Sequence, residues 1–152
     1  MSQPAVETWH IHARINHFLL DALDAESLAA APQPKGRTVA AQFAHLHNVR
    51  KMWLAQAAPD LDAPLEKLDA TGLAAGDMKR HLLQSDEAIA ELLERAFGQN
   101  KVKGFKPHPT AFLGYLISHE SHHRGQILLT LKQNGTLPSK KVLFGLWEWG
   151  VR

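Results

Sequence analysis

The chain has 152 residues, of which 45% are hydrophobic and 21% charged, and this composition excludes a disordered, fibrous or low-complexity protein. It contains no cysteine, which excludes disulfide frameworks, thiolate nucleophiles and iron–sulfur clusters, so any metal must be bound by His, Asp or Glu. The formal net charge is only +2 and the basic residues are scattered, so we expect no nucleic-acid partner. The length predicts a single domain over residues 1–152.

The N-terminal residues lack the basic and apolar pattern of a leader, and no stretch of about 18 apolar residues occurs. We therefore expect a cytoplasmic protein that does not enter a membrane. The ten histidines are unusual in a chain without cysteine, and the functional interpretation depends on them.

Four segments carry apolar side chains with the three-and-four spacing of amphipathic helices, and none alternates convincingly with period two. The predicted helices span residues 6–30, 38–58, 71–97 and 109–133. Pro32 and Pro34 forbid continuation of the first helix. Thr38 is the expected N-cap of the second helix and Pro59 ends it, while Gly98 is the expected residue just past the third.

The fourth predicted helix begins at Pro109, a favourable first position, and stops at Asn134-Gly135. The tail, residues 138–152, is too apolar for a free end and is expected to pack on the helices, as a short helix. The linker over residues 59–70 can span about 36 Å when extended, so it can run the length of a bundle. We predict an all-α four-helix bundle with a crossover connection, with up-and-down topology as the alternative.

His119 and His123 are four residues apart on the inward stripe of the fourth predicted helix, which they share with Leu116 and Ile127. Two imidazoles at this spacing can bind one cation, as they do in helical metal sites. The alternative is that each is a hydrogen-bonded core histidine. Spacing alone does not decide between the two interpretations.

A third ligand can come from the second predicted helix, which carries His45 and His47. His45 shares a stripe with Val49, whereas His47 leans toward Phe43. Only one of the two is expected to face a site between the helices. Periodicity alone favours neither of them.

The strings FAHLHNVRKMWL (residues 43–54) and HESHHRGQI (residues 119–127) resemble the two signature helices of the DinB/YfiT-like family. The resemblance covers nearly the whole chain. It implies a four-helix bundle of unusual connectivity, often dimeric, with one metal bound by three histidines. The family's second-helix histidine stands eight residues before an aromatic residue, which selects His45 against Trp53. Its fourth-helix pair stands in the string that ends in Arg-Gly-Gln, which selects His119 and His123.

Three neutral imidazoles leave open positions on a cation, which is typical of a catalytic site and not of a closed structural one. Water or a substrate thiol can bind and ionise at such a position. The expected cofactor is a divalent metal, Zn or Ni first, with Fe, Mn or Cu as alternatives. His122, Gln126 and His47 are further candidates for the pocket.

Residues 119–123 also match the H-E-x-x-H pattern of zinc peptidases, in which the Glu is a general base. Gln126 and Leu129 stand where the metzincin continuation requires Gly and His. Glu120 lies four residues before Arg124, the favourable order for an ion pair on a helix surface. The ion pair is the preferred interpretation, and Glu120 stays a candidate catalytic residue.

We therefore expect a metal-dependent hydrolase or thiol-dependent S-transferase acting on a small molecule, such as a low-molecular-weight thiol. The alternatives are a non-catalytic helical stress or binding protein with a structural or vestigial metal, and a less favoured zincin-like peptidase. A homodimer is expected because the tail residues 143–149 add aromatic surface that one small core does not readily cover. His10 and His17 are expected to be solvated, and no functional signal attaches to His12, His81 or His108.

Overall fold

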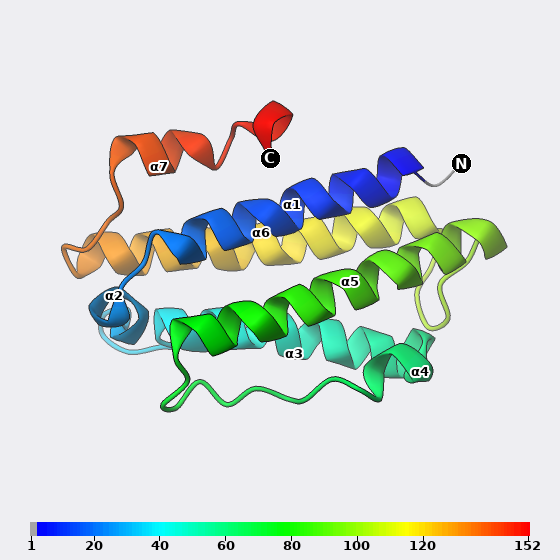
Figure 1. Cartoon of the computed structure of the whole chain (residues 1–152), viewed down its shortest axis with the longest axis horizontal. Coiled ribbons are helices and arrows are strands. Elements are labelled where there is room, and N and C mark those ends of the chain that lie inside the picture. The colour runs from blue at the N-terminus through cyan, green and yellow to red at the C-terminus, as the bar shows by residue number, and fades with distance from the viewer. Residues whose placement is uncertain (1–2) are drawn as a thin grey trace.

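The computed structural model describes residues 3–152, and within that range it contains helices and no strand (Figure 1). Four long helices form a bundle: α1 (Gln3–Asp21), α3 (Val39–Ala57), α5 (Ala75–Gln99) and α6 (Pro109–Gln133). Helix α1 packs against α5 and α6, and α3 packs against the same two helices. The predicted all-α four-helix bundle is confirmed. None of the helices in the described range has the length and apolar character needed to span a membrane.

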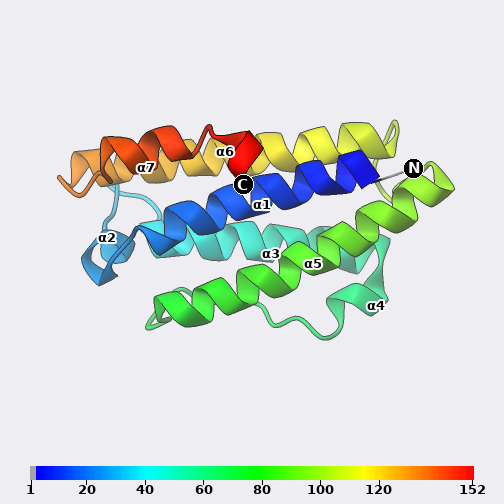
Figure 2. The ribbon, with the colours of Figure 1, turned by 45° about the horizontal axis from the view of Figure 1, so that its top comes forward.

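Helices α3 and α5 run in the same direction, opposite to α1 and α6 (Figures 1 and 2). Two parallel helices cannot be joined by a tight turn. After a short helix, α4 (Pro59–Asp62), residues 63–74 therefore run back along the bundle, as the green segment below α3 in Figure 1 shows. This is the predicted crossover, and the up-and-down alternative is wrong. Part of the predicted linker is helical because Pro59 suits the first position of a helix.

The predicted first helix, residues 6–30, is two helices in the structure. Helix α1 ends at Asp21, and a short helix α2 (Ala25–Ala29) follows. Asp24 caps α2, since its carboxylate accepts a hydrogen bond from the backbone N–H of Ser27 at 2.8 Å. A capping Asp can start a new helix even where the apolar pattern continues. The spacing of the apolar residues alone therefore did not predict the break between the two helices.

The other helix ends follow the sequence closely. Thr38 caps α3 by accepting a hydrogen bond from the N–H of Ala41 at 3.1 Å, and Pro109 is the first residue of α6. Helix α5 continues past Gly98, and Asn100 adopts the left-handed conformation at its end (φ 52°). Asn tolerates this conformation through local hydrogen bonding of its side chain, so the prediction for Gly98 is wrong by two residues.

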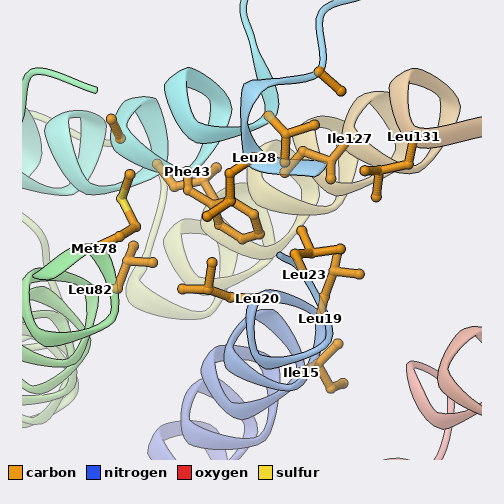
Figure 3. Close-up of a cluster of buried hydrophobic side chains, with 14 of the residues drawn as sticks. Ile15, Leu19, Leu20, Leu23, Leu28, Phe43, Met78, Leu82, Ile127 and Leu131 are labelled. Carbon is orange, nitrogen blue, oxygen red and sulfur yellow. The ribbon is translucent and has the colours of Figure 1, made fainter. Parts of the chain in front are cut away.

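The hydrophobic core forms two clusters with a polar layer between them. One cluster lies toward α2 and includes Leu19, Phe43 and Ile127 (Figure 3). The other surrounds Trp9 and Phe112 at the opposite end of the bundle. Between them all four long helices contribute buried polar side chains: His12, Asn16, His17, Arg50, Ser85, Asp86 and Glu120.

The C-terminal tail forms α7 (Lys140–Gly145) and a 3-10 turn, η1 (Trp149–Val151), beside α1 and α6 (Figures 1 and 2). Leu146 is buried in the core cluster near α2. Gly145 lies so close to Phe18 that a Cβ atom there would be 2.6 Å from the ring. The tail packs back as expected, but Phe144 and Trp147 are 69% and 79% exposed.

Candidate metal centre

Three histidines from two helices meet beside the core. His45 comes from α3, and His119 and His123 come from α6. Each offers a ring nitrogen, and these three atoms lie within 4.8 Å of one another. The Nε2 atoms of His119 and His123 are 3.2 Å apart, and the ring centroid of His45 is 4.5 Å from that of His123. The structure thus brings together the three residues that the sequence predicts as metal ligands.

The packing of α3 against α6 explains this meeting. His119 and His123 are one helical turn apart and so point the same way from α6. Helix α3 runs antiparallel to α6 (Figure 1). It packs against α6, and His45 lies in its second turn. His123 is buried, whereas His45 and His119 are half-buried. The group therefore lies between two helices with one side open to solvent.

All three imidazoles are held in the neutral form. Burial is the main cause that lowers the pKa of His45, His119 and His123. The pKa of His123 falls to about 4, because burial is reinforced by the neighbouring His119 and His45. A neutral imidazole is the form that binds a metal, so at neutral pH no proton has to be displaced.

The sequence analysis did not identify Gln42, which orients His123. The Nδ1–H group of His123 donates to Oε1 of Gln42 at 2.7 Å, and Nε2 of Gln42 donates to Oε1 of Gln126 at 3.1 Å. Because Nδ1 carries the proton, Nε2 of His123 keeps its lone pair for a metal. Such partners fix the ring orientation of ligating histidines in metalloproteins. In the sequence, this role is indicated only by the position of Gln42, about one helical turn before His45 on the same helix.

The donor set fits a divalent transition metal. Three neutral nitrogens with one fixed tautomer suit Zn, Ni, Cu or Fe. Within residues 3–152, no fourth His, Cys, Asp or Glu joins the group. Open positions are therefore available on a bound ion, as catalytic sites require.

Glu120 does not face the three histidines. Its Oε1 accepts a hydrogen bond from Nε of Arg50 at 2.6 Å. Its Oε2 accepts from Nη2 of Arg50, Nε2 of His12 and Nδ2 of Asn16, at 2.8 to 2.9 Å. Burial would raise the pKa of this carboxyl, but the charge of Arg50 and the bonds from His12 and Arg50 lower it below its usual range. The carboxylate is thus ionised and fully engaged in the polar layer, away from the candidate metal centre.

The predicted surface ion pair between Glu120 and Arg124 is wrong. Glu120 is 1% exposed, and Arg124 donates to Oδ1 of Asn16 at 2.8 Å. Spacing along one helix identifies neighbours on that helix, but it cannot show that a cation from another helix lies closer. The expected solvation of His17 is wrong for the same reason, because His17 is buried against Asp86 of α5.

The remaining pocket candidates lie around the centre. His122 is exposed, with its ring centroid 5.1 Å from that of His123. Gln126 is also exposed. Its Nε2 lies 3.1 Å from Nε2 of His122, and its Oε1 accepts the hydrogen bond from Gln42. His47 points instead toward α5 and the crossover. Its Nε2–H donates to the carbonyl of Glu66 at 2.7 Å, and its Nδ1 lies 3.0 Å from Oγ of Ser85.

His47→Ala is expected to leave the metal content of the purified protein nearly unchanged, because both ring nitrogens of His47 already have protein partners. The matched variant His45→Ala is expected to lose its metal. Metal analysis of the two variants, purified in parallel, measures the difference. Equal loss in both would show that the choice of His45 over His47 is wrong.

Comparison with known proteins shows which family the chain belongs to. No curated protein and no solved structure matches the chain. The family model described as the DinB family matches residues 1–142, which is nearly the whole length. The matched range contains both helices that carry the three histidines. The chain therefore belongs to the DinB family.

Proposed function

We propose that this protein is a metal-dependent enzyme that acts on a small molecule, with His45, His119 and His123 as the ligands of a divalent metal, Zn or Ni first. The observation that carries the proposal is the meeting of three neutral imidazole nitrogens within 4.8 Å of one another. When bound, such a metal supplies Lewis acidity to a substrate group and lowers the pKa of bound water or a thiol. Gln42 holds His123 in the tautomer that can bind.

A hydrolase or a thiol-dependent S-transferase is the reaction class that this site supports best. Membership of the DinB family and the open side of the histidine group both favour it. A structural metal site usually has four protein ligands, so the alternative of a non-catalytic protein is less favoured. A zincin-like peptidase is less favoured still. Its general base would be the carboxylate of Glu120, and this carboxylate already accepts hydrogen bonds from Arg50 and His12.

Metal analysis and activity measurements together test this proposal. The purified protein is expected to carry one divalent metal per chain. Hydrolytic and thiol-transfer activities are then measured on metal-loaded and chelator-treated samples, and activity is expected only in the loaded samples. A stoichiometric metal without any activity would favour the non-catalytic alternative, and absence of a stoichiometric metal would overturn the proposal.

The pH dependence of metal binding follows from the lowered pKa values. A protonated imidazole cannot bind a metal, so protons compete with the metal only below the pKa of each ligand. Unperturbed histidine titrates at about 6.5, whereas burial lowers the pKa of all three ligands, that of His123 to about 4. The dissociation constant, measured by indicator competition, is therefore expected to begin to rise at a lower pH than unperturbed histidines would cause. A dissociation constant that begins to rise near pH 7 as the pH is lowered would contradict this.

We also propose a homodimer, supported by the outward-facing rings of Phe144 and Trp147 on the tail. Light scattering at tens of micromolar protein is expected to give the mass of two chains. Trp147→Ser is expected to shift the population toward monomer, because it removes the most exposed ring. A wild-type protein that is wholly monomeric under these conditions would reject the dimer.

A further inference from the structure

An open cleft of about 1180 Å³ lies beside the candidate metal centre. It is formed by α2, the first half of α3 and the end of the crossover. His45 lines the cleft, so one wall belongs to the three-histidine group. Alanine and leucine side chains make up most of the remaining lining, which suits the apolar body of a small molecule.

The cleft carries two cations without partners. Among the charged side chains that line it, Asp69 accepts a hydrogen bond from the N–H of Thr71 at 2.9 Å. Arg37 and Lys67 are exposed, and neither forms an ion pair or hydrogen bond within the described chain. The lining therefore has a net charge of one positive, with histidine neutral.

Arg37 lies within electrostatic reach of the metal centre. Arg37 and His45 line the same cleft, and His45 is one of the three histidines of that centre. The positive charge of Arg37 would repel a divalent ion held by these histidines. The only carboxylate lining the cleft, that of Asp69, is bonded within its own loop. An anion bound between Arg37 and the metal centre would remove this repulsion.

Lys67 is held at the cleft from both sides. His47 donates to the carbonyl of Glu66 at 2.7 Å. The Asn48 side chain donates to the carbonyl of Leu68 and accepts from its N–H, both at 2.9 Å. These bonds fix the crossover backbone on either side of Lys67 against α3. The backbone of Lys67 is therefore held at the edge of the cleft.

We infer that the substrate is a small organic carboxylate, with its charged group bound by Arg37 next to the metal centre and its apolar body along the alanine and leucine lining. The inference rests on the proposed function and adds the substrate class to it. A guanidinium binds a carboxylate through two parallel hydrogen bonds. An organic acid also has an apolar body that can lie along the alanine and leucine lining, which inorganic phosphate lacks.

Calorimetric titration with paired acids and amides tests this inference. The probes are propanoate, hexanoate and 3-phenylpropanoate, each compared with its uncharged amide, and inorganic phosphate. At least one acid is expected to bind about tenfold more tightly than its amide, and affinity is expected to rise with apolar size. Arg37→Gln is expected to remove this preference. Lys35 is a cation of the same loop that does not line the cleft, so Lys35→Gln is expected to keep the preference for the acid.

Metal content measured on the same samples separates the two proposals. Preference for the acid that depends on Arg37, in a protein that never binds metal, supports the carboxylate site and overturns the metal-dependent enzyme. A stoichiometric metal with equal binding of acids and amides overturns the carboxylate site alone. Phosphate binding more tightly than every acid also overturns it, as does an acid preference that Arg37→Gln leaves unchanged.

Discussion

Replacing His45, His119 or His123 by Ala is expected to strip the metal from the purified protein in each case and to abolish metal-dependent activity. Two imidazoles are too few to hold an ion tightly at an open site, since a catalytic centre of this kind uses three protein ligands. The helices are expected to survive, because most of the stability of the bundle comes from its two apolar clusters. Metal analysis and circular dichroism on the same preparations measure the two effects.

Three further features of this experiment make it decisive. The melting temperature of the metal-loaded wild type is expected to exceed that of each variant, because a ligand that binds only the native state stabilises it. A double variant is expected to resemble the single ones, since an empty site has no metal left to lose. His122→Ala, a neighbouring but exposed histidine, is the matched control and should retain its metal. Metal that persists in all three ligand variants would mean that these histidines are core residues.

The main architecture could be predicted from the sequence because it depends on local patterns. The apolar spacing indicates the long helices, and Pro109 marks the start of the last one. The length of the linker after Pro59 indicates the crossover. The pair His119 and His123 stands out because both imidazoles lie on one inward stripe. Spacing alone did not separate His45 from His47, and the resemblance to the DinB/YfiT-like family selected His45.

The polar layer could not be predicted, because its members are explained only by residues on other helices. Arg50 and Asp86 have the appearance of surface charges in a helical pattern, and His12 carries no signal along the chain. In the structure these groups come from three helices, and each is almost fully buried. The burial of such a residue depends on partners far away in the sequence, and periodicity does not identify those partners.

Arg50 is the centre of this layer. Burial would lower the pKa of its guanidinium, but the carboxylates of Asp86 and Glu120 outweigh that effect and raise it. Two parallel bonds join Arg50 to Glu120, at 2.6 and 2.9 Å, and Nη1 contacts Oδ1 of Asp86 at 2.5 Å. The central carbon of the guanidinium also lies 5.1 Å from the ring centroid of Trp9. One side chain therefore links α3 to α1, α5 and α6.

Arg50→Met is expected to lower the free energy of unfolding by about 3 to 5 kcal/mol, because it leaves two buried carboxylates without their cation. Glu120→Gln, which keeps the shape of the side chain, is expected to destabilise in the same direction, since Arg50 would lose one of its two anions. Urea denaturation of metal-free protein measures both effects without a contribution from metal binding. Arg95→Met is the matched control: the ion pairs of Arg95 with Asp60 and Glu91 are exposed, so the change is expected to stay within about 1 kcal/mol. If the Arg50 and Arg95 variants unfold at the same urea concentration, the polar layer does not stabilise the bundle.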